Sequence, residues 1–261
     1  PNMDSSDTFD LAKQIKARYS GIPVVLLTPF SKAVTQSLSR EDLSGIDYVF
    51  SWLGDTDLLL AIIKVVEDRM NVEHDVKTVG VQTIMLVEDS VRFYSSALPL
   101  LYKFVLSESK EFSKEALNDH LRMLRMRGRP KILLARNYEE AVAYYSKYGD
   151  NMLGVISDMS FNVNGEKDRL AGKRLGEWIR EKDIYIPIIY TSSESENSKY
   201  INGDNAVFID KSSKTFPQDL RRAIKDNLGF GDFIITDPKT KEEIFRIKNL
   251  KELQMNIRNI P

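Results

Sequence analysis

The sequence predicts an α/β fold, in which helices cover both faces of a parallel β-sheet. Short apolar runs of strand length alternate along the chain with longer stretches whose apolar residues recur at helical spacing. This alternation occurs twice, and 42% of the 261 residues are apolar, which is enough to fill the cores of two units. We therefore expect a globular chain with two successive α/β units.

The composition excludes several functional classes. The 37 basic and 38 acidic residues nearly cancel, so we expect neither nucleic acid nor a membrane as a partner. The absence of cysteine excludes disulfides and thiolate metal sites and suits a reducing cytoplasm. His74 and His120 lie far apart among charged residues, which disfavours zinc. Neither a signal peptide nor a run of about 20 apolar residues is present, so the sequence indicates a cytoplasmic protein.

The first predicted unit covers residues 1–70. Its expected elements are a helix at Thr8–Tyr19, strands at Ile22–Leu27 and Asp47–Phe50, and a helix at Leu58–Met70. An α/β domain seldom begins with an exposed helix that lacks its own strands, so we expect the chain to be a fragment that starts inside a domain. The polar and charged residues 71–81 are predicted to be a linker.

The second predicted unit covers residues 82–229 and has five strands. The strands are expected at Thr83–Val87, Lys131–Ala135, Leu153–Ser157, Ile186–Tyr190 and Ala206–Ile209. The helices are expected at Val91–Leu106, Glu111–Met126, Glu139–Lys147, Ala171–Glu181 and Phe216–Asn227. This alternation fits a flavodoxin-like, doubly wound five-stranded parallel sheet with strand order 2-1-3-4-5, in which ligands bind beyond the carboxyl ends of the strands.

Polar side chains follow four of these strands. Glu88 and Asp89 follow the first strand, Asp158 the third, Thr191 the fourth and Lys211 the fifth. Three carboxylates meeting at one edge would repel one another unless a hard cation held them, and Mg²⁺ prefers such oxygen ligands. A carboxylate beside Mg²⁺ can attack a phosphoryl group while a lysine and a hydroxyl stabilise the transferring oxygens. The set predicts phosphoryl transfer to an aspartate.

At these positions the chain resembles the receiver domains of two-component response regulators. The matching residues are the acidic pair Glu88-Asp89, then Asp158, Thr191 and Lys211, in this order along the chain. The resemblance implies that Asp158 is the phosphoacceptor and that Thr191 and Lys211 are its catalytic partners. It also implies the flavodoxin-like fold and a role in a phosphorelay.

The resemblance further implies a metal site, a switch and partners. The implied Mg²⁺ ligands are Asp158, Asp89 directly, Glu88 through water and the backbone carbonyl of Ser160. Phe208, three residues before Lys211, matches an aromatic switch position, so Thr191 and Phe208 are expected to shift on phosphorylation. The implied partners are a histidine kinase or phosphotransfer protein and an attached or associated output domain. Formation of a homodimer is left open.

Each of these residues also has an ordinary structural interpretation. An acidic pair after a strand is typical of a helix N-terminus, where the dipole favours carboxylates. Asp158 could lie in a loop, Thr191 in a turn and Lys211 among solvated charges, and Phe208 could belong to the core. The alternative function is a catalytically idle pseudo-receiver, a scaffold for dimerisation or docking. A phosphatase of the haloacid dehalogenase type is disfavoured because Ser160 stands where its second aspartate would be.

Two features depart from the receiver pattern. The interval from Asp89 to Asp158 leaves room for about one additional helix, which predicts a helical insertion near 107–129. The end of this segment carries a basic cluster: Arg122, Arg125, Arg127, Arg129 and Lys131. The cluster is interpreted as a solvated helix end, or alternatively as a surface for an acidic partner or nucleic acid. Ser212 stands after Lys211, where receivers commonly have proline.

The first unit resembles the last part of a receiver. Thr28 falls at the hydroxyl position and Asp47–Trp52 aligns with the final strand. Ser51 stands where the lysine should be, and any phosphoacceptor would precede Pro1. The resemblance therefore implies a partial pseudo-receiver that is not phosphorylated.

The tail, residues 230–261, is expected to begin a downstream module. It has strand-like runs at Phe233–Ile235 and Ile244–Ile247 and a helical pattern at Leu250–Ile257. Its segments Phe230–Phe233, Asp237-Pro238 and Lys248–Leu253 resemble the region that joins paired receivers to a phosphoenolpyruvate synthase or pyruvate phosphate dikinase-like enzyme. This resemblance implies a regulatory front end for such an enzyme, and whether the chain itself has enzymatic activity is left open.

Overall fold

The chain divides into two compact units in a computed structural model. The described residues are 5–29, 42–52, 54–114, 128–201, 203, 205–228, 233–236 and 243–247. One unit comprises residues 1–66 and 90–99, and the other comprises residues 67–89 and 100–261. Helices α3 (Asp57–Val79) and α4 (Val91–Lys114) both cross this division. Residues 71–81 do not form the expected linker, because α3 continues as far as Val79.

The first unit contains a parallel strand pair. Helix α1 (Ser5–Arg18) is followed by strands β1 (Val25–Pro29) and β2 (Tyr48–Trp52), which pair in parallel. Tyr94, in the first half of α4, donates its hydroxyl to the Val49 carbonyl and packs edge-on against Phe50, with ring centroids 5.4 Å apart. The two expected strands and two expected helices of this unit are present, but β1 begins three residues later than expected and α3 ends nine residues later. The origin of the unit as a partial pseudo-receiver stays a prediction.

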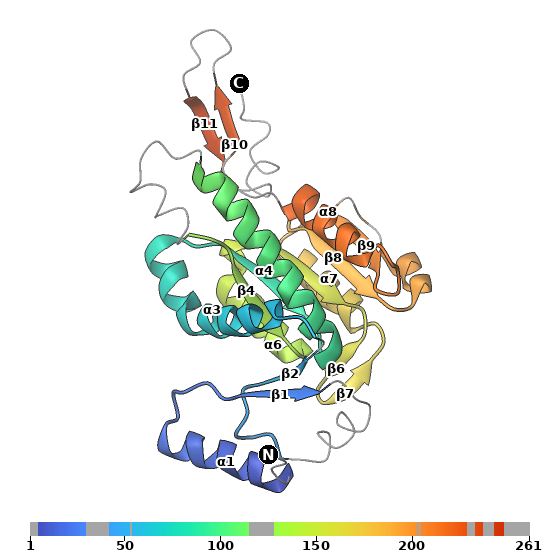
Figure 1. Cartoon of the computed structure of the whole chain (residues 1–261). Helices are drawn as coiled ribbons and strands as arrows, with labels where there is room; N and C mark the ends of the chain where they lie inside the picture. The colour runs from blue at the N-terminus through green and yellow to red at the C-terminus, as the bar shows by residue number, and fades with distance from the viewer. Residues whose placement is uncertain are drawn as a thin grey trace. The chain divides into compact units, whose positions relative to one another are not determined.

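The second unit is built on a five-stranded parallel sheet. Its strands are β3 (Thr83–Val87), β4 (Lys131–Ala135), β5 (Met152–Asp158), β8 (Ile188–Ser192) and β9 (Ala206–Asp210). They lie in the order β4-β3-β5-β8-β9, which reads 2-1-3-4-5 when only these strands are counted along the chain. Figure 1 shows β8 and β9 of this sheet next to each other. The predicted α/β class with a parallel central sheet is confirmed.

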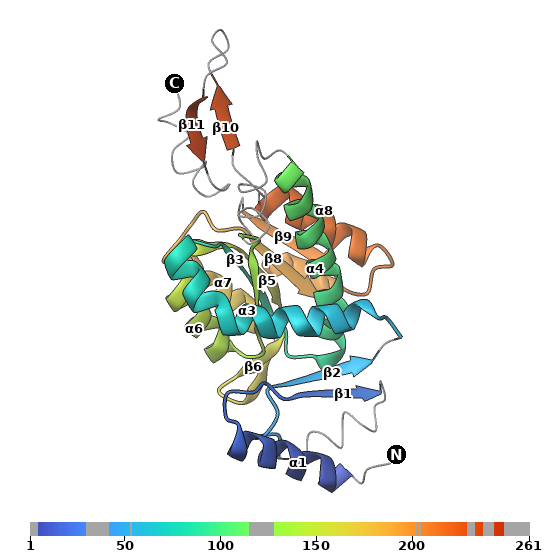
Figure 2. The same cartoon turned by 60° about the vertical axis from the view of Figure 1, so that its left-hand side comes forward.

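Helices cover both faces of this sheet. Figure 2 shows α6 (Tyr138–Tyr148) and α7 (Ala171–Arg180) on one side, and α8 (Phe216–Leu228) with the second half of α4 on the other. Met85 and Val155 from the strands pack with Leu175 of α7 in the core of the first side. Burial of one such leucine stabilises the fold by about 2 kcal/mol. On the other side α8 approaches closely, since a Cβ on Gly154 would lie 2.2 Å from Leu228 Cδ2.

Two antiparallel hairpins complete the described part of the unit. Strands β6 (Phe161–Val163) and β7 (Glu166–Asp168) lie between β5 and α7 and were not predicted. Strands β10 (Phe233–Thr236) and β11 (Glu243–Ile247) confirm the two strands expected in the tail. The helix expected at Leu250–Ile257 lies outside the described residues. No helix in the described ranges is long and apolar enough to span a membrane.

A buried carboxylate joins α3 to the start of β4. Asp68 is completely buried, and its oxygens accept hydrogen bonds from the Arg129 guanidinium at 2.7 and 3.0 Å. The Tyr102 hydroxyl and the Ile132 backbone N–H also donate to Asp68, each at 2.9 Å. Burial opposes the charge of the guanidinium, but Asp68 outweighs this effect and raises the pKa of Arg129. The guanidinium is thus held in its charged form.

The basic cluster is therefore not a solvated helix end at its last two residues. Arg129 is buried against Asp68, and the buried Lys131 pairs with Asp75 at 2.7 Å. Both charges form ion pairs inside the protein, because each lies beside a carboxylate of α3. Arg122, Arg125 and Arg127 lie outside the described residues, as does most of the expected helix Glu111–Met126, of which 111–114 belong to the end of α4.

Substitution of Asp68 tests this network. Asp68→Asn should lower the free energy of unfolding by about 3 kcal/mol, because the Arg129 charge stays buried without its counter-ion. Urea denaturation measures the change. The matched control is Glu73→Gln, which removes a carboxylate of the same helix whose partners Lys77 and Lys147 are exposed. The control should unfold at nearly the wild-type midpoint, and equal midpoints for both variants would contradict the structural role of Asp68.

Candidate functional site

The sheet register brings the predicted site residues to one edge. Asp158 pairs with Thr191 in neighbouring strands, and Ser192 pairs with Asp210. Glu88 directly follows β3, and Lys211 directly follows β9. Because all these strands are parallel, their carboxyl ends lie at the same edge, as the sequence predicts.

Three carboxylates gather at this edge. One oxygen from each of Glu88, Asp89 and Asp158 lies within 4.8 Å of the other two. The Glu88 side chain is almost fully buried, and those of Asp89 and Asp158 are about one-eighth exposed. Charges this close and this poorly solvated repel one another, so the site requires positive groups.

Lys211 supplies one of these positive groups. Its Nζ lies 3.0 Å from Oδ1 of Asp158 and also pairs with Oε2 of Glu88. The side chain is only 3% exposed, and its backbone N–H donates to the Ser192 carbonyl at 2.7 Å. Lys211 is thus held from both its backbone and its ammonium, even though Ser212 follows in place of proline.

Lys167 supplies the second positive group and was not predicted. Its Nζ lies 2.7 and 3.0 Å from the two carboxylate oxygens of Asp89 and 2.8 Å from the Ser160 carbonyl. Lys167 belongs to β7, whose hairpin turns at Asn164-Gly165, with φ of 51° and 83°. Asn-Gly favours a two-residue hairpin turn, so this dipeptide was the available signal in the sequence.

The two predicted switch residues occupy different environments. Thr191 is buried, and its hydroxyl donates to the Ser157 carbonyl at 3.4 Å. Phe208 is partly buried and packs against the core on the α6 and α7 side. Between them in the sheet lies Tyr190, whose pKa is raised to about 12 by burial, so that its phenol stays neutral.

The oxygens at this edge fit a Mg²⁺ ion. Carboxylates and a backbone carbonyl are the ligands that Mg²⁺ takes in proteins. Asp89 and Ser160 already share one cation, the Lys167 ammonium, and Asp158 lies beside them in the same acidic cluster. Glu88 is turned toward Lys211, which suits a contact with the ion through water.

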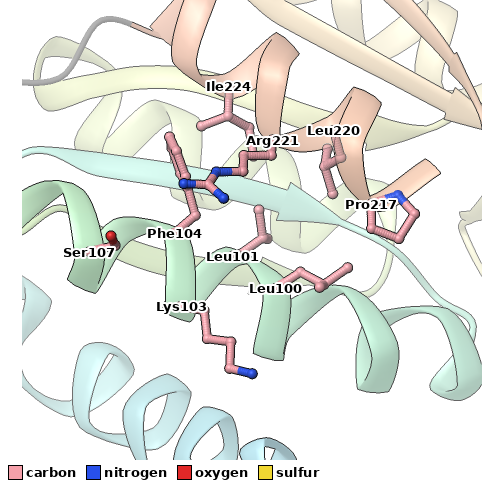
Figure 3. Close-up of a pocket in the computed structure, with 9 residues that line it drawn as sticks. All are labelled: Leu100, Leu101, Lys103, Phe104, Ser107, Pro217, Leu220, Arg221 and Ile224. Carbon is pink, nitrogen blue, oxygen red and sulfur yellow. The ribbon is translucent and has the colours of Figure 1, made fainter. Parts of the chain in front are cut away.

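A separate pocket of about 280 Å³ lies between α4 and α8 (Figure 3). It is lined by Leu100, Leu101, Lys103, Phe104, Ser107, Pro217, Leu220, Arg221 and Ile224. The lining is mainly apolar and includes no carboxylate. The chemistry expected from the sequence therefore belongs to the edge of the sheet and not to this pocket.

A substitution at Gly172 tests whether α7 packs directly against the end of β5, where Asp158 lies. A Cβ on Gly172 would lie 2.1 Å from the backbone oxygen of Asp158, which cannot move without disturbing the end of β5. Gly172→Ala should therefore lower the free energy of unfolding by about 2 kcal/mol or more. Thermal or urea unfolding measures this effect. Gly21→Ala is the control, since a Cβ there meets nothing within 4 Å. A Gly172→Ala protein as stable as the control would refute the close contact.

Comparisons with known proteins give only distant likenesses. No family model and no curated protein matches the chain. A response regulator receiver domain protein from Clostridium thermocellum is similar in structure, with 16% identity over 57% of this chain and 94% of that one, at a TM-score of 0.37. A response regulator receiver protein from Sinorhizobium medicae gives 17% identity, the same coverages and a TM-score of 0.36. At such low identities and TM-scores, neither structure decides the function of this chain.

Proposed function

We propose that the second unit is a signalling receiver that accepts a phosphoryl group on Asp158. The observation that carries this proposal is the convergence of Glu88, Asp89 and Asp158 at one sheet edge, with the Lys211 ammonium 3.0 Å from Asp158. A nucleophilic carboxylate needs positive groups that stabilise the transferring oxygens, and this edge supplies them.

Asp158 acts as the nucleophile. Met159 N–H and Lys211 both bind Oδ1 of Asp158, so Oδ2 is the oxygen that attacks phosphorus. The bond from phosphorus to the donor's leaving nitrogen or oxygen breaks, and the leaving atom keeps the electron pair and takes up a proton. An aspartyl phosphate results, and its oxygens are stabilised by the Lys211 ammonium.

The remaining residues orient the group and report its arrival. Asp89, Asp158 and the Ser160 carbonyl would hold Mg²⁺, with Glu88 bound through water, and the ion would neutralise charge on the phosphoryl oxygens. The Thr191 hydroxyl leaves the Ser157 carbonyl for a phosphoryl oxygen, and Phe208 follows it inward.

The proposed donor is a histidine kinase or a phosphotransfer protein. The proposed output is an attached or associated domain, such as a phosphoenolpyruvate synthase-like enzyme, in keeping with the resemblance of residues 230–261. The first unit would then be a pseudo-receiver, because Ser51 stands where a lysine is needed.

A catalytically idle scaffold is the second candidate. Lys211 and Lys167 already neutralise much of the acidic cluster, so the edge is stable without any further chemistry. A scaffold of this kind would pair chains or dock to a partner and would not need Mg²⁺. Titration with Mg²⁺ separates the two candidates.

Phosphorylation of the whole chain tests the first candidate. Incubation with Mg²⁺ and a small phosphodonor such as acetyl phosphate should add one hydroxylamine-labile phosphoryl group, detected by intact-protein mass spectrometry. Asp158→Asn should abolish the modification completely, because the amide is not a nucleophile. Asp150→Asn, near the opposite end of β5, should retain it. Equal labelling of wild type and Asp158→Asn, or no labelling at all, would remove Asp158 from this role.

A further inference from the structure

Lys167 holds the oxygens that a metal ion would need. A lysine ammonium has three N–H donors, and here all three have acceptors. They are Oδ1 of Asp89 at 3.0 Å, Oδ2 of Asp89 at 2.7 Å and the Ser160 carbonyl at 2.8 Å. Asp89 and the Ser160 carbonyl are two of the groups proposed to bind Mg²⁺, so the ammonium stands where the cation would bind.

The hairpin of β6 and β7 is built to place Lys167 there. At its base Phe161 is fully buried in the core, and Asp168 forms an ion pair with Arg174 of α7. At its tip the backbone N–H of Asn164 donates to the Glu139 carboxylate at 2.8 Å. The hairpin is therefore anchored without Lys167, and the lysine contributes to the site more than to the fold.

We infer that Lys167 is a resident cation that occupies the metal-binding oxygens until Mg²⁺ displaces it. In this role Lys167 sets the Mg²⁺ concentration at which Asp158 becomes reactive. The inference rests on the proposed phosphoacceptor function for its biological meaning. Its physical content is a competition between one ammonium and one divalent ion for the oxygens of Asp89 and Ser160.

The two lysines of the site differ in solvent exposure, which decides how easily each can be displaced. The Lys167 side chain is 52% exposed, whereas that of Lys211 is 3% exposed. Lys167 can move its ammonium into water at small cost, because an ion pair with a solvent-exposed partner contributes little. Lys211 would lose two buried ion pairs without regaining water. A divalent ion that enters the site therefore displaces Lys167 and leaves Lys211 in place.

Mg²⁺ and the Lys167 ammonium cannot share these oxygens. Mg²⁺ requires oxygens at about 2.0–2.1 Å, which places its double charge within the acceptor shell of the ammonium. The two cations repel each other strongly at such a separation. Metal binding thus releases Lys167 from Asp89, and the outer face of β7 gains a free ammonium.

Calorimetric titration of the whole chain with Mg²⁺ tests the competition. Lys167→Met keeps an unbranched side chain that is one atom shorter and removes the charge, so its Mg²⁺ dissociation constant should be about fivefold lower than that of wild type. Lys167→Arg retains a cation at the site and should stay close to wild type. Lys173→Met removes a nearby charge whose partner is Glu177, at 3.4 Å, and should also match wild type. Circular dichroism checks that each variant is folded.

Amine acetylation followed by peptide mass spectrometry gives a second readout on wild type. Lys167 should react faster in Mg²⁺ than in NaCl of the same ionic strength, because displacement frees its ammonium. Lys173 serves as the internal reference and should react at the same rate in both salts.

The outcomes separate this inference from the proposed function. Equal Mg²⁺ affinity for wild type and Lys167→Met, or weaker binding by Lys167→Met, would overturn the competition and leave the phosphoacceptor proposal standing. No Mg²⁺ binding by any variant at millimolar concentration would overturn both, because the proposed transfer needs the ion. Tighter binding by Lys167→Met and Lys173→Met alike would also overturn the inference, since it would show a general effect of net charge.

Discussion

Repulsion among three carboxylates is the constraint on which the rest of this site depends. A parallel sheet places the carboxyl ends of its strands at one edge, so Glu88, Asp89 and Asp158 meet in a poorly solvated volume. Such a cluster folds only if positive charge is built in. Lys211 and Lys167 supply that charge, the first buried and the second half-exposed. The fold thereby places positive groups beside all three carboxylates, and one of the two cations remains accessible to solvent.

The same unit holds a buried carboxylate whose two oxygens are both hydrogen-bonded within the protein. Asp68, near the amino end of β4, accepts hydrogen bonds from Arg129, Tyr102 and the Ile132 backbone, so both of its oxygens are used inside the protein. Its partners are fixed and buried, and no oxygen is left for a ligand. Among the described residues, the bonds to Asp158 fall on Oδ1 and leave Oδ2 available. Asp68 is fully hydrogen-bonded and therefore suits a structural role, whereas the available oxygen of Asp158 suits its proposed chemical role.

Features that depend on neighbouring residues in the sequence were predicted well, and features that depend on residues far apart in the sequence were not. Strand ends in the second unit were predicted to within two residues, because a buried strand is a short apolar run followed by polar residues, which is local information. The hairpin that carries Lys167 was missed because its strands have three residues each, too few to show alternation, although Asn164-Gly165 marked its turn. The ion pair of Asp68 with Arg129 joins residues 61 positions apart, so the sequence showed only an unpaired basic cluster. Residues 71–79 are mostly exposed on α3, and their polarity reflects this exposed surface and not a break between domains.

The net charge of the proposed site changes when it binds a metal ion and again when Asp158 is phosphorylated. Three carboxylates and two ammonium groups leave one net negative charge. Entry of a divalent ion with both lysines in place would reverse this sign, and departure of Lys167 restores neutrality. Phosphorylation then replaces the single charge of Asp158 by about two, so the edge becomes negative again and attracts Lys167. The Lys167 ammonium, on the hairpin of β6 and β7, is thus released from the metal-bound edge and attracted by the phosphorylated one. A surface beside Asp158 would report phosphorylation through this hairpin, in addition to the shift of Thr191 and Phe208.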